Sequence, residues 1–343
     1  MFNQFSQQLK QWYPRRDEQQ WVLGTLYKIE GPSYRSPGAM MLFNDAGEQF
    51  GLLSGGCLEA DIQQRASQVM HSQCSMTICY DASDEDDMSF LMGIGCGGII
   101  YILLQPLTAG NNYLQLPTIC NILEKRQTCV FLQKITEHGE KAESRMVDQG
   151  SYDFSVITKQ LGSRSSCLIS LNDHAWLATT MKPPLHLLIV GGGVDARPVA
   201  SLAATLGWET TLCDPRPANA RREHFMQVHT ILRCSPLELT DEPLFKAFDA
   251  AIVMTHNLQL DANAVAALQM SAIKYLALLG PAVRRDKVLE LANLDKNKVM
   301  VPIAGPAGLR LGGDLPEDIA LSILAECQAV INHKDANSIS NLL

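Results

Sequence analysis

The sequence predicts an α/β protein in which an N-terminal α+β domain is followed by a C-terminal doubly wound parallel sheet. Over the first hundred residues, short apolar strands alternate with turns. After residue 185, a buried-strand run, a glycine turn and an amphipathic helix follow one another. Pro183 and Pro184 stiffen the chain immediately before this second pattern. We therefore expect the main domain boundary at these prolines.

Composition and charge narrow the class of protein. The 343 residues are 46% hydrophobic and 19% charged, which is typical of a globular chain of roughly two domains. The net charge is -8, with 28 Lys plus Arg against 36 Asp plus Glu, so neither nucleic acid nor an anionic membrane is an expected partner. No apolar run reaches the roughly 18 residues of a spanning helix, and the first residues lack the pattern of a signal peptide. The expected location is the cytoplasm.

The first domain is expected over residues 1–110. Apolar runs between turns predict its strands at 21–29, 39–43, 49–53 and 99–105. A helix is predicted after the third of these strands, because four apolar residues recur there at three- and four-residue spacing: Leu58, Ile62, Ala66 and Val69. Periodicity is weaker over 111–184, where strands are expected at 129–135 and 167–171. We interpret this segment as a connecting β subdomain.

Two cysteines flanked by glycines are the candidate functional groups of the first domain. Cys57 follows Gly55 and Gly56, and Cys96 lies between Gly95 and Gly97. Glycine permits positive φ and removes side-chain bulk, so the backbone can bring a thiol and its own amides close to a ligand. Cys57 falls where a strand gives way to a helix N-terminus, whose amides favour anions and thiolate. Among the ten cysteines no C-x-x-C pair occurs, which excludes a zinc knuckle or a thioredoxin-type motif.

The second domain is expected over residues 185–333, with a tail over 334–343. The sequence here predicts a βαβ unit. It consists of a strand at 186–190, the turn Gly191-x-Gly193-x-x-Ala196, a helix, and a strand at 209–213 that is followed by Asp214. This is the dinucleotide fingerprint of a Rossmann-like fold, in which the acid binds a ribose hydroxyl. Further strands are predicted at 250–254 and 275–279, and a last helix begins near 314–318. His256 follows one of these strands, at the edge where ligands bind in such sheets.

The fingerprint predicts the fold more firmly than the ligand. Glycines in a strand-to-helix turn also serve close helix packing, so NAD(P) or another nucleotide stays one alternative. Asp195 is expected at the N-cap or in the first turn of the helix that follows Gly193. A carboxylate there stabilises the helix and competes with a bound pyrophosphate.

Motifs along the whole chain resemble those of the xanthine dehydrogenase accessory factor family, XdhC/CoxI. In the first half the similar stretches are Gly31-Pro32-Ser33-Tyr34-Arg35-Ser36-Pro37-Gly38-Ala39, Ser54-Gly55-Gly56-Cys57-Leu58-Glu59 and Gly95-Cys96-Gly97-Gly98. In the second half they are Asp214-Pro215-Arg216, Met254-Thr255-His256, Leu279-Gly280, 304–309 and 316–326. This chain differs from many members at Val194-Asp195, where they have a histidine, and at Pro281-Ala282-Val283, where they have an arginine-rich stretch.

The resemblance implies a protein that binds molybdenum cofactor (molybdopterin), supports its sulfuration by a cysteine desulfurase and delivers it to a molybdenum hydroxylase of the xanthine dehydrogenase type. It implies an escort, forming a homodimer, rather than an enzyme that turns over. The resemblance implies that Cys57 and Cys96 contact molybdenum or sulfur, and we expect their two sulfur atoms to lie close together. The expected cofactor-binding residues are Arg35, Gly55, Gly56, Cys57, Gly95, Cys96, Gly97, Gly191, Gly193, Asp214 and His256.

Two other functions stay open at this point. An NAD(P)-dependent oxidoreductase is motivated by Gly191, Gly193, Ala196 and Asp214. A non-catalytic scaffold would use its Rossmann half only to dimerise or to dock partners.

Overall fold

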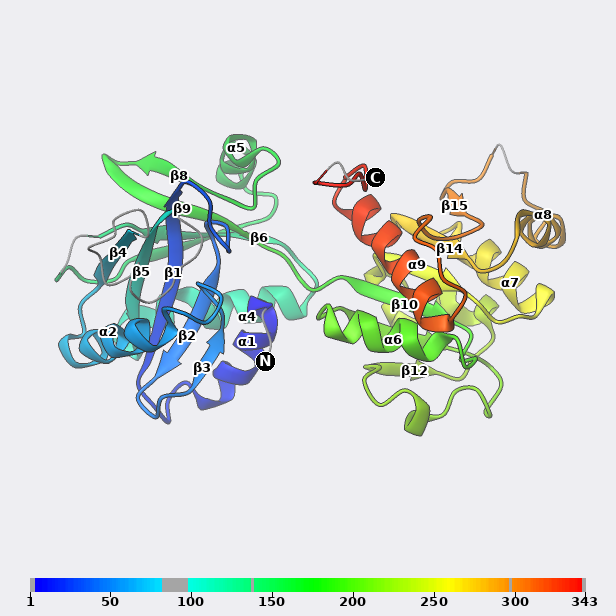
Figure 1. Ribbon diagram of the computed structural model, residues 1–343, viewed down its shortest axis with the longest axis horizontal. Coiled ribbons are helices and arrows are strands. Elements are labelled where there is room, and N and C mark those ends of the chain that lie inside the picture. The colour runs from blue at the N-terminus through cyan, green and yellow to red at the C-terminus, as the bar shows by residue number, and fades with distance from the viewer. Residues whose placement is uncertain (1–3, 82–97, 137–138, 296–297, 341–343) are drawn as a thin grey trace. The chain divides into compact units, whose positions relative to one another are not determined.

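The computed structural model describes residues 4–81, 98–136, 139–295 and 298–340 (Figure 1). The chain divides into two compact units, Met1–Pro183 and Pro184–Leu343. Residues 111–183, which the sequence analysis treats as a separate connecting subdomain, belong to the same compact unit as the residues before them. None of the helices within the described ranges has the length and apolar character needed to cross a membrane.

An antiparallel sheet of five strands, in the order β3-β2-β1-β5-β4, organises the first part of unit one. Its strands are β1 (Trp21–Glu30), β2 (Met40–Asn44), β3 (Gln49–Gly51), β4 (Met76–Asp81) and β5 (Ile99–Leu107). Helix α2 (Glu59–Ser72) covers one face through Ile62, Ala66 and Val69, which are fully buried as their spacing predicts. The other face packs against α1 (Phe5–Trp12) and α4 (Leu116–Glu124).

A second antiparallel sheet of four strands, in the order β7-β6-β9-β8, completes unit one. Its strands are β6 (Cys129–Lys134), β7 (Ser144–Asp148), β8 (Ser166–Leu171) and β9 (His174–Met181), and α5 (Tyr152–Leu161) packs on it. The two sheets are joined by buried polar contacts, in which Gln133 Nε2 donates to Thr25 Oγ1 at 2.9 Å and to Gln105 Oε1 at 3.0 Å. Cys129, Phe131 and Met181 also share an apolar cluster with strands β1 and β2, so residues 111–183 do not stand apart from the first sheet.

The second unit is a parallel sheet of six strands in the order β12-β11-β10-β13-β14-β15. Its strands are β10 (His186–Val190), β11 (Glu209–Cys213), β12 (Thr230–Leu232), β13 (Ala250–Val253), β14 (Tyr275–Leu278) and β15 (Ile303–Ala304). Helices α6 (Ala196–Thr205) and α9 (Pro316–Ile331) cover one face, and α7 (Leu258–Leu268) and α8 (Ala282–Leu291) cover the other (Figure 1). The doubly wound, Rossmann-like prediction is confirmed.

Short 3-10 helices complete the described secondary structure. They are η1 (Tyr13–Arg15), η2 (Ala109–Gln115), η3 (Arg222–His224), η4 (Pro236–Asp241) and η5 (Pro243–Ala247). In unit two the strand order reverses between β10 and β13, and the loops that leave these two strands begin at Gly191 and Met254. In open α/β sheets such a reversal is where ligand crevices form.

Candidate functional site

Cys57 lies on an exposed loop between β3 and the start of α2. Gly55 and Gly56 have φ of +99° and +111°, a left-handed conformation that glycine adopts without strain. Cys57 stands two residues before the first helical residue, Glu59, which is the placement that the sequence predicts. The thiol is therefore presented to solvent at a helix entrance.

Glu59 holds this loop in place. Its Oε1 accepts hydrogen bonds from the amides of Leu53 at 3.2 Å and Ser54 at 2.9 Å, and its Oε2 accepts one from the Ser54 hydroxyl at 2.6 Å. Burial alone raises the pKa of Glu59, but the hydrogen bonds from Ser54 and Leu53 outweigh it, and the pKa is lowered. The carboxylate is ionised at neutral pH and fixes the backbone that carries Cys57.

The loop over residues 31–38 lies against Gly55 of the first glycine-cysteine motif and against Gly98 of the second. A Cβ placed on Gly55 would meet the Tyr34 ring at 3.4 Å, and one placed on Gly98 would overlap the carbonyl oxygen of Pro32. Arg35 is half-buried, and among the described residues its guanidinium has no carboxylate within ion-pair distance. Arg35 directly follows Tyr34, the residue that lies against Gly55.

The second glycine-cysteine motif falls mostly outside the described residues. Gly95, Cys96 and Gly97 are not among them, and only Gly98, at the start of β5, is described. The convergence of the Cys57 and Cys96 sulfurs therefore stays a prediction.

The glycine turn of unit two serves backbone packing at its first two positions. Gly191 has φ of +111°, and a Cβ there would lie 2.6 Å from the carbonyl oxygen of Met254. A Cβ on Gly192 would overlap the carbonyl oxygen of Asn219. A Cβ on Gly193 would meet only side-chain atoms, those of Asp195 and His256. The turn is thus pressed against neighbouring loops at Gly191 and Gly192.

Asp214, the expected ribose acceptor, is fully buried and satisfied by the protein itself. Its Oδ2 accepts from the Gly192 amide at 2.8 Å, from Arg216 Nη2 at 2.7 Å and from Asn219 Nδ2 at 3.2 Å. Its Oδ1 accepts from the Arg216 amide and from Arg216 Nε, both at 2.9 Å. Five donors occupy the roughly four lone-pair positions of the carboxylate. In this arrangement no acceptor is left for a ribose hydroxyl.

Hydrogen bonding also sets the ionisation of Asp214. Burial raises its pKa, but the hydrogen bonds from the Arg216 side chain, the Gly192 and Arg216 amides, and Asn219 outweigh burial and lower the pKa. The group is therefore a charged, internal partner of Arg216.

His256 and Asp195 meet at the reversal of the sheet. His256 follows β13, has φ of +59°, and its Nε2 lies 2.7 Å from Asp195 Oδ2. Asp195 occupies the N-cap position of α6, but its side chain makes no capping hydrogen bond. It bonds His256 instead, because β10 and β13 are neighbours and bring their two loops together. The expected N-cap position of Asp195 is therefore confirmed, but its carboxylate bonds His256 and makes no capping hydrogen bond.

A second buried ion pair lies behind these loops. The fully buried Asp261 accepts from the Thr255 amide at 3.1 Å, from the Thr255 hydroxyl at 2.6 Å and from Arg284 Nη2 at 2.6 Å. Arg216 Nη2 donates to the Thr255 carbonyl at 3.1 Å, which links this pair to Asp214. This network is not among the features that the sequence predicts. The signal available in the sequence was two charged residues, Asp261 and Arg284, next to strand ends in a parallel sheet.

The described residues offer no metal site made of protein ligands alone. Within those ranges, no three His, Cys, Asp or Glu side chains lie together in a way that could hold a metal ion.

Taken together, the fold and the site define a two-unit α/β protein with an exposed thiol on a glycine loop in one unit and a Rossmann domain in the other. The family model described as "XdhC and CoxI family" matches residues 15–81, and the one described as "XdhC Rossmann domain" matches residues 187–327. The chain belongs to this XdhC and CoxI family.

Relatives and a solved structure agree with the family. The chain is 32% identical over 320 residues to a probable xanthine dehydrogenase subunit of Bacillus subtilis (strain 168), covering 90% of this chain and 93% of that one. It is 25% identical to the molybdenum cofactor insertion chaperone PaoD of Escherichia coli (strain K12), covering 92% and 85%. A crystal structure of a xanthine dehydrogenase from Bacillus halodurans is similar with a TM-score of 0.79 and 28% identity, covering 98% of each chain.

Proposed function

We propose that this protein is a maturation factor that binds molybdenum cofactor, supports its sulfuration and delivers it to a molybdenum hydroxylase of the xanthine dehydrogenase type. The observation that carries the proposal is the exposed Cys57 thiol on a loop that Glu59 fixes at the entrance of α2. The name of the Escherichia coli relative, a molybdenum cofactor insertion chaperone, supports the same role. The cofactor is cargo in this function.

The chemistry of the loop fits such a cargo. A thiolate is a soft ligand of the kind that suits molybdenum or a sulfur-bearing centre. A helix entrance favours thiolate and other anions through its unpaired amides. Arg35 follows Tyr34, whose ring lies against Gly55 of this loop, and we include its charge in the proposed site. A cysteine desulfurase as sulfur donor and a homodimeric assembly belong to the same proposal.

The test compares cofactor retention in matched cysteine variants. Purified protein is incubated anaerobically with molybdenum cofactor, and protein-bound molybdenum and pterin are quantified after gel filtration. We expect Cys57→Ser to lose most of the bound cofactor, whereas Cys79→Ser, which changes another exposed cysteine of the same unit, retains it. No retention by the unaltered protein would contradict the function. Equal retention by both variants would contradict the role of Cys57.

For the second unit, the site residues disfavour binding of a dinucleotide through its ribose. We infer this from Asp214, whose carboxylate is occupied by Arg216, Gly192 and Asn219. A ligand that stabilises only the folded state raises the melting temperature. We therefore expect no rise with millimolar NAD+ or NADP+. A rise that Gly193→Asp abolishes would restore the oxidoreductase alternative.

A further inference from the structure

Unit one contains a hollow of about 550 Å³ between the end of β1, the loop over residues 31–38 and the start of β8. Its volume lies within the range of about 300–1,000 Å³ that is usual for small-molecule sites. The polar groups that line it include Tyr27, Lys28, Ser36, Arg164 and Ser165. The hollow involves none of the expected site residues.

Local backbone irregularity shapes this hollow. The pairing of β1 with β5 shifts register between Leu26 and Lys28, so Tyr27 lies in a β-bulge, a feature that re-aims side chains next to sites. On the other side, Gly38 has φ of +92° and approaches β8 so closely that a Cβ there would lie 2.9 Å from Ser166 Cβ. The Ser166 hydroxyl donates to the Pro37 carbonyl, which anchors the loop against β8. The walls are therefore fixed by the fold.

The lining is rich in donors and contains no carboxylate. Arg164 uses Nε and Nη2 to reach the carbonyls of Leu161 and Gln160 at 3.4 and 3.2 Å, which leaves Nη1 without a protein acceptor among the described residues. Lys28 is held 2.6 Å from Glu30. Burial raises the pKa of Tyr27 and keeps its phenol a donor. In a chain of net charge -8, such a surface is suited to an oxyanion.

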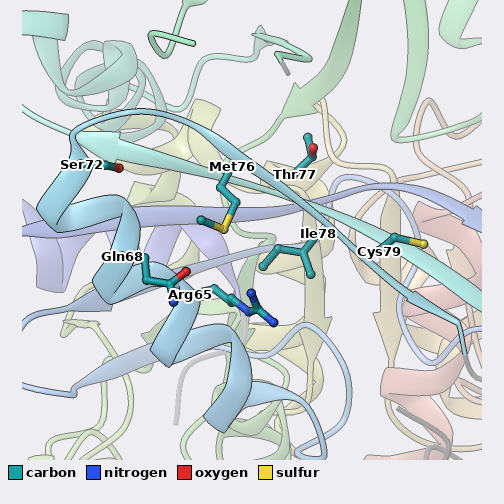
Figure 2. A pocket seen from close by; sticks show the side chains of 7 residues that line it. All are labelled: Arg65, Gln68, Ser72, Met76, Thr77, Ile78 and Cys79. Carbon is teal, nitrogen blue, oxygen red and sulfur yellow. The ribbon is translucent and has the colours of Figure 1, made fainter. Parts of the chain in front are cut away.

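A second hollow in the same unit provides a contrast. Figure 2 shows Arg65 and Gln68 of α2 directed toward Met76 and Ile78 of β4. There the cation has a carboxylate beside it, because Arg65 Nε lies 3.7 Å from Asp61 Oδ2. Each hollow therefore has one cation beside a carboxylate, Lys28 with Glu30 and Arg65 with Asp61. Only the first hollow also carries Arg164, whose guanidinium makes no ion pair among the described residues.

We propose that the hollow lined by Ser36, Arg164 and Ser165 binds the phosphate group of a small organic phosphate. On the function proposed above, on which this identification of the ligand rests, that molecule is molybdenum cofactor, whose pterin carries a phosphate. The loop over residues 31–38 borders both the hollow and the Cys57 loop. Ser36 lines the hollow, and Tyr34 lies against Gly55, two residues before Cys57. A nucleotide or a sugar phosphate would present the same group.

The test places a carboxylate inside or outside the hollow on the same stretch of chain. Ser165→Asp puts the charge in the lining, and Ser170→Asp puts it on an exposed position of β8. Binding of glycerol 3-phosphate and AMP is measured by titration calorimetry. We expect Ser165→Asp to weaken binding at least tenfold and Ser170→Asp to leave it unchanged. Equal binding by the two variants, or no binding by the unaltered protein, would overturn the proposal.

A second arm identifies the source of the phosphate and separates this proposal from the proposed function. Retention of molybdenum cofactor is measured in the same two variants. Loss in Ser165→Asp alone supports the cofactor as the ligand. Retention in both, together with weakened binding of glycerol 3-phosphate in Ser165→Asp, supports the hollow as a site for another phosphate ester. If the unaltered protein retains no cofactor, the proposed function is wrong. The binding of glycerol 3-phosphate and AMP then still tests whether the hollow is a phosphate site.

Discussion

At the level of single residues, burial separates the cysteines into reactive and inert groups. Cys57 is exposed, whereas Cys120, Cys129 and Cys327 are buried. Burial raises the pKa of Cys120 to about 11 and those of Cys129 and Cys327 to about 12. The thiolate is the nucleophile, and a pKa of about 12 in place of about 8.5 lowers its population on the order of a thousandfold at neutral pH.

We therefore expect iodoacetamide at pH 7.5 to modify Cys57 at least about 100-fold faster than Cys327 in the folded protein. Peptide mass spectrometry over a time course gives the two rates. Modification of the unfolded protein, in which both rates should be similar, is the control. Comparable rates in the folded protein would show that Cys57 is not presented as described.

Gly192 allows a second test at single-residue scale. A methyl group there would overlap the backbone carbonyl oxygen of Asn219, and backbone cannot move aside cheaply. Gly192→Ala should lower the free energy of unfolding by about 2 kcal/mol or more, as overpacking does. Gly193→Ala is the matched control and should have a smaller effect, because its neighbour is the end of the flexible Asp195 side chain. Denaturant titration of both variants gives the comparison.

The buried Asp214 makes stability depend on acid. Because its pKa is lowered in the folded state, its contribution is present above the unfolded pKa of about 3.9 and is lost as the pH falls through the folded pKa. Asp214→Asn should cost about 1–3 kcal/mol at pH 7, since the donors around this buried position then lose a charged acceptor. The difference in unfolding free energy between Asp214→Asn and the unaltered protein should become smaller as the pH falls. Denaturant titrations between pH 7 and pH 3 measure it, and a constant difference would refute the account.

At the scale of elements, the start of α2 depends on one side chain. Glu59→Ala would leave the amides of Leu53 and Ser54 without their acceptor. We expect faster hydrogen exchange over residues 53–58 and a loss of about 1–3 kcal/mol of unfolding free energy. Gln64→Ala, at an exposed position of the same helix, should change neither. Unchanged exchange in Glu59→Ala would show that Glu59 does not hold the loop.

Elements with strong periodicity could be predicted from the sequence, and some weaker signals were missed. Helix α2 and the unit formed by β10, α6 and β11 agree with their apolar spacing. Helix α1 was missed although Phe5, Leu9 and Trp12 have helical spacing. Strand β9 was missed although Asn172 and Asp173, both with positive φ, mark a two-residue hairpin turn after β8.

Contacts between loops could not be predicted in the same way. His256 lies 61 residues from Asp195, and Arg284 lies 23 residues from Asp261. These pairs meet only because neighbouring parallel strands end at one edge. Asp214 follows β11 as the sequence predicts, but nothing in the sequence pattern indicated that Arg216 and Gly192 would occupy its carboxylate.

At the scale of the whole molecule, each compact unit has hydrophobic cores of its own. Ile62→Ala, at a fully buried position of α2, should destabilise unit one by about 2–5 kcal/mol. Hydrogen exchange measured peptide by peptide on the full chain should show faster opening in residues 1–183 and unchanged opening in residues 184–343. Equal acceleration in both would show that the units unfold together.

The occupied carboxylate of Asp214 also constrains how this lineage can change. Loss of Arg216 would leave the buried Asp214 carboxylate without its ion-pair partner, at a cost of about 3–5 kcal/mol. That is a large part of the roughly 5–15 kcal/mol by which most proteins are stable. Among related sequences, we therefore expect Asp214 and Arg216 to be replaced together or to be both retained. Relatives that use the acid for a ribose hydroxyl should lack the arginine two positions later.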